Sequence, residues 1–202
     1  MVLINIGVHK LESYKNSDGV FENSFFLQRP YLNYLIYSPR SIEMFYDYFS
    51  SKGGVGKQIY TNASQVIHSS HKAFNKYGAS ALITNPKKQT FNPDLKIEYY
   101  GEDFIDKDIE YPWKSDHDLH WFIIRQKNKN FLITDEHIIL SEHGWQPNPK
   151  YTYDDHKVKL IEDIQKCKID YLLPRNHVGD FYLQKMNKNS IKDSIQYFKQ
   201  RL

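Results

Sequence analysis

Short apolar runs that fit β-strands alternate along this sequence with segments of helical periodicity. The runs 23–28 and 33–37 flank the dipeptide Arg29-Pro30 and predict a β-hairpin with a turn between its strands. Apolar residues recur at every third or fourth position of 41–51, which predicts a helix that the following glycine pair ends. This alternation predicts a fold that layers helices on sheets.

The same alternation continues through the rest of the chain. Further strands are expected at 58–61, 80–84, 96–100, 121–125, 130–134 and 170–173, and further helices at 64–77, 158–164 and 191–202. Pro174 is expected to end the strand before it, and Ser190 with Asp193 fits a capping box for the last helix. The predicted fold class is therefore α/β (α+β) with mixed sheets.

The size and composition of the chain fit one folded domain over residues 1–202. Of its 202 residues 40% are hydrophobic, which is enough to bury a sizeable core. The 27 basic and 24 acidic residues give a net charge of +3 without a basic block, so a nucleic-acid partner is not expected. No stretch approaches the ~20 apolar residues of a membrane span, so a membrane partner is not expected either.

Cys167 is the single cysteine of the chain. It allows neither an intramolecular disulfide nor a cysteine-based zinc cluster, which fits a reducing compartment. Because the N-terminus is also unlike a signal peptide, we expect a cytoplasmic protein. The thiol itself is interpreted as a small buried hydrophobe rather than a nucleophile.

The stretch Lys52-Gly53-Gly54-Val55-Gly56-Lys57 resembles a phosphate-binding loop of ATPases. Such a loop follows a buried strand and opens a helix whose N-terminus faces the phosphates. In this sequence the helix comes before the glycines and a strand-like run comes after them, and Gln58 stands where a Ser or Thr would reach Mg²⁺. We therefore interpret the stretch as a helix stop followed by a turn.

Five landmarks occur in an order that resembles the metallo-β-lactamase fold hydrolases, a metallo-hydrolase/oxidoreductase superfamily. They are Asn33-Tyr34-Leu35-Ile36-Tyr37, Gly54-Val55-Gly56-Lys57-Gln58-Ile59-Tyr60-Thr61, His117, Phe131-Leu132-Ile133-Thr134-Asp135 and Tyr171-Leu172-Leu173-Pro174-Arg175-Asn176-His177. The resemblance extends from about residue 22 to the C-terminus. It implies a single domain with an αββα sandwich, in which two mixed β-sheets are flanked by helices.

The metal-binding loop of that superfamily is altered in this chain. In the superfamily a strand that ends in Thr leads into a His-x-His-x-Asp-His loop, which supplies four metal ligands. Here Thr61 is followed by Asn62-Ala63-Ser64-Gln65-Val66-Ile67, so the four ligand positions hold groups that bind zinc poorly or not at all. The resemblance therefore implies a degenerate metal site.

Three later landmarks match ligand types of the superfamily. The resemblance implies that His117 is a ligand of the first metal, Asp135 the carboxylate that bridges both metals, and His177 a ligand of the second. Two such ions make hydroxide from water and stabilise the oxyanion that its attack creates. Three residues hold at most one ion weakly, which would be zinc, iron or manganese. The other interpretation is that they are relics at strand ends that bind no cofactor.

Other polar residues near these positions are candidates for replacing the lost ligands. His68 and His71 follow the altered loop, and the apolar stripe around His71 favours a core histidine. His120, His137 and His143 could also replace lost ligands, but they are interpreted as ordinary surface histidines. Asp116 and Asp118 flank His117 and are interpreted as a solvated acidic turn, the alternative being that they orient His117 or act as an acid or base.

Two functions from different classes follow from these features. One is a non-catalytic descendant, a pseudoenzyme that keeps the fold as a binding or assembly module for a small molecule or a protein. Losing the charged ligands removes a repulsion that metal otherwise neutralises, so such a fold is stable without metal. The other is a mononuclear metal-dependent hydrolase of an ester, thioester or phosphoester, with activated water as nucleophile and the ion held by His117, Asp135 and His177.

Overall fold

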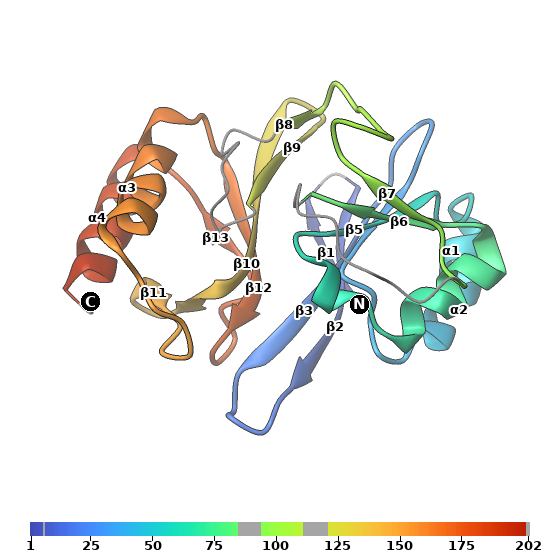
Figure 1. Ribbon diagram of the computed structural model, residues 1–202, viewed down its shortest axis with the longest axis horizontal. Coiled ribbons are helices and arrows are strands. Elements are labelled where there is room, and N and C mark those ends of the chain that lie inside the picture. The colour runs from blue at the N-terminus through green and yellow to red at the C-terminus, as the bar shows by residue number, and fades with distance from the viewer. Residues whose placement is uncertain (6, 85–93, 111–120, 201–202) are drawn as a thin grey trace. The chain divides into compact units, whose positions relative to one another are not determined.

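The computed structural model describes residues 1–5, 7–84, 94–110 and 121–200, which fall into two compact units (Figure 1). The first unit comprises Met1–Tyr14 and Asn23–Lys107, and the second comprises Lys15–Glu22 and Asp108–Leu202. Within the described ranges no helix is long and apolar enough to cross a membrane.

The first unit is built from parallel strands with helical crossovers. Its elements are β1 (Val2–Asn5), β2 (Val8–Lys15), β3 (Phe21–Leu27), β4 (Tyr34–Ile36), η1 (Ile42–Phe45), α1 (Tyr46–Ser51), β5 (Lys57–Tyr60), η2 (Ala63–Gln65), α2 (His68–Tyr77), β6 (Ser80–Ile83) and β7 (Ile97–Tyr99). Strands β4, β5, β6 and β7 are parallel neighbours, whereas β3 is antiparallel to β4 and also pairs with β2. Parallel neighbours need a crossover, and α1 and α2 provide two of them.

The core of the first unit lies between these helices and the sheet. Strands β4 and β6 are buried over their whole length, as expected for parallel strands covered on both faces. The buried residues that pack together are Leu11, Phe26, Leu35, Ile42, Phe49, Val55, Ala73 and Ala79. Gly78 ends α2 in the left-handed conformation, with φ of 71°, which glycine adopts without strain.

The second unit is centred on one long strand. Its elements are β8 (Ile109–Glu110), β9 (Phe122–Gln126), β10 (Lys129–Ser141), β11 (Gly144–Pro147), α3 (Asp155–Asp163), η3 (Ile164–Lys166), β12 (Tyr171–His177), β13 (Gln184–Lys185) and α4 (Lys188–Lys199). Strand β10 is antiparallel to β9 and β11 and parallel to β12. The expected hairpin between β9 and β10 is confirmed, and its turn residues Lys127 and Asn128 have φ of 46° and 63°.

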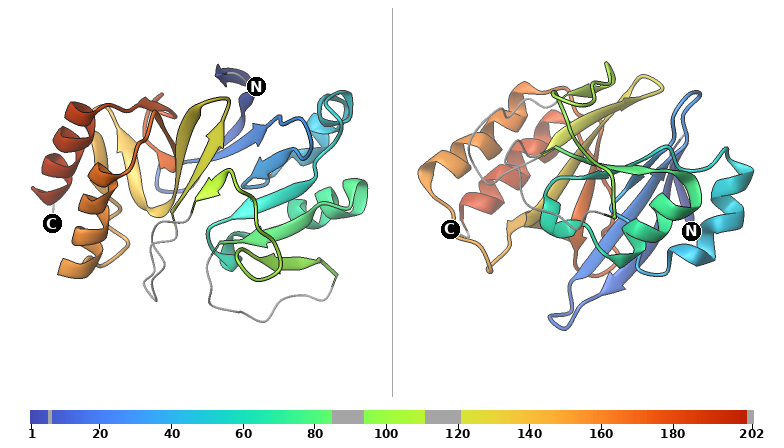
Figure 2. Two further views of the ribbon diagram at one scale, coloured as in Figure 1. Left: turned by 90° about the horizontal axis from the view of Figure 1, so that it is seen from above. Right: turned by 45° about the vertical axis from the view of Figure 1, so that its right-hand side comes forward.

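The two helices of the second unit lie side by side (Figures 1 and 2). They cover an apolar core whose largest members are Trp121 and Trp145, packed edge to face at 6.2 Å between ring centroids. The other buried members are Ile123, Leu132, Ile138, Leu140, Ile161, Ile164, Ile169, Leu172, Met186, Ile191 and Ile195. The spacing of Ile191 and Ile195 therefore identified the buried face of the last helix correctly.

The described strands join into one hydrogen-bonded sheet, so the expected separation into two sheets is not seen in them. The reason lies in β3, whose first residues, Phe21 and Glu22, belong to the second unit and pair there with His177 and Asn176 of β12. Its later residues pair with β4. The strand pairing is therefore continuous along β3. The expectation is confirmed only in part, as a mixed sheet with helices packed on it.

Two expected boundaries were wrong. Strand β12 continues through Pro174 to His177, because the β10–β12 ladder becomes irregular directly after the Thr134–Pro174 pair and sheets tolerate proline beside such irregularities. The last helix begins at Lys188, earlier than expected. Its cap is Asn187, whose side chain accepts from the Ser190 amide while the Ser190 hydroxyl accepts from the Asn187 amide.

Candidate functional site

The loop after β5, where the superfamily pattern has its metal ligands, is held together by its own side chains. Oε1 of Gln65 accepts hydrogen bonds from the Thr61 amide at 3.1 Å, the Thr61 hydroxyl at 2.9 Å and the Asn62 amide at 3.1 Å. Oδ1 of Asn62 accepts in turn from the Ser64 amide at 3.0 Å. Asn62 and Gln65 thus form a capping box around η2, in which Gln65 is buried.

A buried polar network lies beneath this loop and ties α2 to β5. Nε2 of Gln58 donates to the Ser70 carbonyl at 2.9 Å and to the Ala79 carbonyl at 2.8 Å. The hydroxyls of Tyr60 and Ser70 lie 2.6 Å apart, and Tyr60 also donates to Oε1 of Gln58. Because every one of these buried groups has a partner, the network stabilises a single position of the helix.

The helix that follows the loop does not present the expected apolar stripe. Its buried side chains are the small residues Ser69, Ser70 and Ala73, whereas His71 is half-buried and His68 is exposed. The expectation of a core histidine at 71 was therefore wrong. Small residues are buried here because α2 approaches the sheet closely.

Asp135 is almost completely buried, and both of its oxygens face protein donors. Oδ1 accepts from the indole nitrogen of Trp121 at 2.8 Å and from the backbone amide of His137 at 3.0 Å. Oδ2 lies 3.1 Å from Nδ1 of His137. The carboxylate that the resemblance assigns to metal bridging is therefore surrounded by groups of the protein itself.

Each member of this pair shifts the pKa of the other toward its charged form. Burial by itself would raise the pKa of the carboxyl, but the contact with His137 and the hydrogen bond from Trp121 outweigh burial and lower it. Burial would lower the pKa of His137, but the Asp135 carboxylate outweighs burial and raises it. The interpretation of His137 as a surface residue was wrong, because its side chain is only 8% exposed.

The pair lies in a bulge of β10. In the ladder with β12, Thr134 is opposite Pro174, and the next printed pair joins Ile139 to Asn176. Between these two pairs, β10 has four residues, 135–138, whereas β12 has only one. Such an irregularity re-aims side chains at a strand end, and here it directs Asp135 toward Trp121.

His177 is a strand residue with aromatic neighbours. Its ladder neighbours are Leu140 of β10 and Phe21 of β3, and its ring stacks on that of Phe21 at 5.0 Å between centroids. Tyr182 contacts it edge-on at 6.4 Å. The side chain is 2% exposed, so His177 is a buried residue rather than a relic on the surface.

The other sequence candidates fall into two groups. His117 lies outside the described residues, as do His120, Asp116 and Asp118, so their assignments stay predictions. His143 is exposed, with Nε2 3.4 Å from the carboxylate of Glu142. Cys167 is half-buried against the core of the second unit, which agrees with the interpretation as a small hydrophobe, and burial raises the pKa of its thiol.

The described residues do not fit a metal ion. In residues 1–5, 7–84, 94–110 and 121–200, no three His, Cys, Asp or Glu side chains gather as a metal site. Asp135 uses both oxygens for protein contacts, and the side-chain amide oxygens of Asn62 and Gln65 in the loop after β5 already accept hydrogen bonds. No catalytic step through a metal follows from this arrangement.

The glycine-rich stretch is a helix stop and turn, as the sequence indicated. Gly53 and Gly54 follow α1 with φ of 89° and 81°, and Nδ2 of Asn33 donates to the Gly54 carbonyl. Lys57, the lysine that would contact phosphate, is instead in β5 and forms an ion pair with Glu98. The stretch therefore does not form a phosphate-binding loop.

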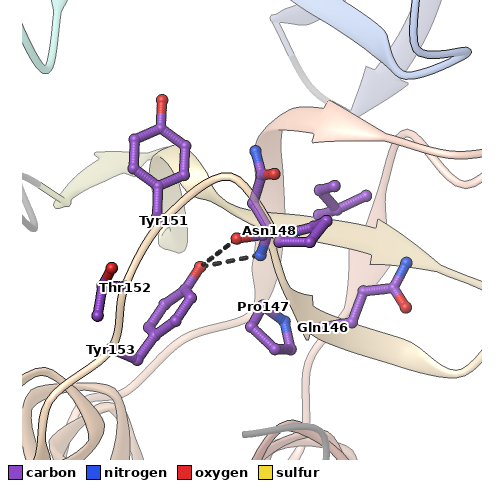
Figure 3. Close-up of a pocket in the computed structure, with 8 residues that line it drawn as sticks. Gln146, Pro147, Asn148, Tyr151, Thr152 and Tyr153 are labelled. Atoms are coloured by element: carbon purple, nitrogen blue, oxygen red, sulfur yellow. Dashed lines mark hydrogen bonds between the residues drawn. The ribbon is translucent and has the colours of Figure 1, made fainter.

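A pocket of about 560 Å³ is formed largely by the segment 146–153, at the end of β11 and after it (Figure 3). Tyr151 lines it and packs on the ring of His137 at 4.2 Å between centroids. The hydroxyl of Tyr153 accepts from the Asn148 amide at 2.9 Å and donates to the His137 carbonyl. Burial, with the nearby Glu136 and Asp135 carboxylates, raises the pKa of Tyr151 to about 12, so the phenol stays neutral. The pocket is lined by Ile139, Gln146, Pro147, Asn148, Pro149, Tyr151, Thr152 and Tyr153.

Sequence reasoning missed the residues that organise this region. Gln65 carried a usable signal, because Asn62-x-x-Gln65 matches the capping-box pattern. Trp121 and Tyr151 carried none, since their contacts with Asp135 and His137 are made across the fold.

Solved metallo-β-lactamases have a fold similar to this one. DIM-1 metallo-β-lactamase exposed to ceftazidime matches with a TM-score of 0.60 and 11% identity, over 96% of this chain and 94% of that one. The Pontibacter korlensis metallo-β-lactamase matches with 0.58 and 9%, over 96% of each chain. FIM-1 from Pseudomonas aeruginosa in its mono-zinc form matches with 0.57 and 11%, over 98% and 93%. No family model matches the sequence, and no curated protein matches it significantly.

Proposed function

We propose that this chain, which has the metallo-β-lactamase fold, is a non-catalytic descendant that has lost most of the dinuclear metal site and keeps the fold as a binding module. The observation that carries the proposal is the loop after β5. There one amide oxygen, Oε1 of Gln65, accepts three hydrogen bonds from Thr61 and Asn62. These bonds fix the loop conformation that ligand–metal bonds would otherwise fix, so the loop is ordered without an ion.

The second support is the charge balance at Asp135. A buried carboxylate needs a nearby positive charge and hydrogen-bond donors, which a metal ion would supply in a metallo-hydrolase. Here the imidazole of His137 and the indole of Trp121 supply them. The pair of Asp135 and His137 therefore takes over the structural role of the metal, and neither residue needs an ion to balance its charge.

The binding partner proposed for this module is a small molecule or a protein in the cytoplasm, and not a nucleic acid or a membrane. The pocket beside His137 offers a concave surface with two tyrosines, two prolines and two side-chain amides on its wall. Its volume of about 560 Å³ lies in the range of small-molecule sites.

The test is the metal content of protein purified without a histidine tag or chelator. The protein is incubated with zinc, iron(II) or manganese, desalted and analysed by elemental mass spectrometry, beside a His177→Ala variant of matched circular dichroism. We expect far less than one ion per chain in both samples. Near-stoichiometric metal that disappears in the variant would overturn the proposal.

That contrary result would support the second candidate, a mononuclear metal-dependent hydrolase of an ester, thioester or phosphoester. Its specific support is the burial of Asp135 and His177, which are 1% and 2% exposed. Two potential ligands shielded from water are retained at adjacent strands, and His117 would complete the set. Hydrolysis of an ester or phosphoester substrate by the metal-loaded protein, lost in His177→Ala, would identify this activity.

A further inference from the structure

A second pocket, of about 770 Å³, lies at the start of β12. Its walls come from two segments, 165–170 before β12 and 187–192 at the start of α4. His177 is at the other end of β12, which a strand rise of about 3.3 Å per residue places about 20 Å away. This pocket is therefore separate from the residues that the fold associates with metal.

Lysines dominate the charge of this second pocket. Lys166, Lys168, Lys188 and Lys192 line it, and all four are exposed. The single acidic residue on its wall is Asp170, whose carboxylate already accepts from the Asn130 amide at 2.9 Å and from Lys129 at 3.2 Å. The negative charge of Asp170 is therefore already balanced by groups outside the pocket wall.

Three of the four lysines are not paired within the part of the chain that the structure describes. Nζ of Lys166 lies 2.6 Å from the Asp163 carboxylate. Lys168, Lys188 and Lys192 have no ion pair with a described residue. Like charges gathered at one cavity repel one another, and an anion bound among them would relieve that repulsion.

The orientation of α4 adds to the positive potential. Its 12 residues begin at Lys188, so the first-turn amides and the positive end of the helix dipole are at the pocket. The reciprocal hydrogen bonds of Asn187 and Ser190 fix this helix end in place. Backbone and side chains thus contribute charge of the same sign.

We propose that this second pocket binds a small oligoanion, a molecule carrying two or more phosphoryl groups. Lysine ammonium groups are point charges with three donors each, which suit the several oxygens of a phosphoryl group. Charge comes from both walls, which favours an extended anion over a single phosphate. The volume lies within the range of small-molecule sites. The proposal does not depend on the function proposed above.

The chain carries its own reporter for this binding. Cys167 is the only cysteine of the sequence, lines the same pocket and is half-buried. The experiment measures the rate at which N-ethylmaleimide alkylates Cys167 in the intact protein, with and without inorganic triphosphate at constant ionic strength. Isothermal titration calorimetry with triphosphate gives the affinity independently. We expect a several-fold slower alkylation and a saturable binding isotherm.

Two matched triple variants distinguish binding at this pocket from a general attraction of triphosphate to a positively charged protein. Lys168→Gln, Lys188→Gln and Lys192→Gln together should weaken triphosphate binding at least tenfold and abolish the protection of Cys167. Replacing the exposed Lys76, Lys107 and Lys159 by glutamine removes the same charge elsewhere and should change neither result. Absence of saturable binding in the natural protein would overturn the proposal, as would equal losses in both triple variants. Tight binding of an oligonucleotide without triphosphate binding would overturn it too.

Discussion

Nδ1 of His137 lies 3.1 Å from Oδ2 of Asp135, and both residues are buried in the second unit. The indole of Trp121 completes the surroundings of the carboxylate with a hydrogen bond of 2.8 Å. A carboxylate that the metallo-β-lactamase pattern associates with metal thus belongs to an internal ion pair. The predictions below test this pair, the loop after β5 and an ion pair in the first unit.

Removing the charge of Asp135 should destabilise the second unit. Asp135→Asn is expected to lower the free energy of unfolding by about 3 kcal/mol, because it removes the carboxylate that faces the buried His137 ring. His137→Gln should have a similar effect for the converse reason. Urea denaturation followed by circular dichroism measures both, with the exposed Asp180→Asn as a control that stays near the natural protein.

The double variant of Asp135 and His137 tests whether the two effects share one interaction. If the ion pair carries them, the double variant should lose about 1–3 kcal/mol less than the sum of the single losses. Additive losses would contradict the pair and point to two separate roles.

Chelation should leave the stability of the protein unchanged. Protein groups surround the Asp135 carboxylate and bond the amide oxygen of Gln65 in the loop after β5, so under the proposed function the fold does not need a metal ion. Differential scanning calorimetry with and without EDTA should give the same Tm within about 1 °C, since only a bound ion would shift it by mass action. A large decrease of Tm with EDTA that zinc reverses would favour the hydrolase candidate.

Gln65 should be important for the stability of the first unit. Gln65→Ala removes the acceptor for three donors on Thr61 and Asn62, and we expect a loss of about 2 kcal/mol in the free energy of unfolding. Gln65→Glu keeps an acceptor oxygen at the same place and should lose less. Chemical denaturation of the two variants decides this, and equal losses would show that the hydrogen bonds are unimportant.

The ion pair between Lys57 and Glu98 predicts a pH dependence of stability. Burial by itself would raise the pKa of Glu98, but hydrogen bonds from Lys57, Lys96 and Ser80 outweigh burial and lower the pKa to about 2 from the ordinary 4.5. A carboxyl whose pKa is lower in the folded state stabilises the fold fully above its unfolded pKa. That stabilisation is lost as the pH falls from 4.5 toward 2.

The measurement compares urea denaturation of the natural protein and Glu98→Gln at pH 7, 5 and 3. The variant should be less stable by about 2 kcal/mol at pH 7, because Lys57 loses its buried counterion, and the difference should shrink at pH 3. Glu43→Gln removes an exposed partner of Lys72 and should have little effect at any pH. A difference between the natural protein and Glu98→Gln that does not change with pH would contradict the assignment.

Local pattern in the sequence determined much of the fold. The hairpin of β3 and β4, the helices that end at glycine, and the α4 face formed by Ile191 and Ile195 all follow from periodicity and turn residues. The order of the glycine-rich stretch also excluded a phosphate-binding loop correctly, because a helix precedes it and a strand follows it. These features depend on neighbours a few residues apart.

The sequence did not predict where β12 ends or which strands pair in the sheet. Pro174 was expected to end β12, yet the strand continues to His177. The ladder between β10 and β12 becomes irregular directly after Pro174, and a proline is tolerated beside such an irregularity. One sheet formed where two were expected, because β3 pairs with β12 at one end and with β4 at the other. Both outcomes depend on which strands become neighbours.

The candidate site divides in the same way. The sequence by itself determined that the four ligand positions after Thr61 are altered, since this is a matter of residue type. Only the tertiary structure decided which groups surround these positions, namely Gln65 within the loop and His137 with Trp121 around Asp135. Residue types are local, whereas the charge and hydrogen bonds around a buried carboxylate come from strands and helices that meet only when the chain folds.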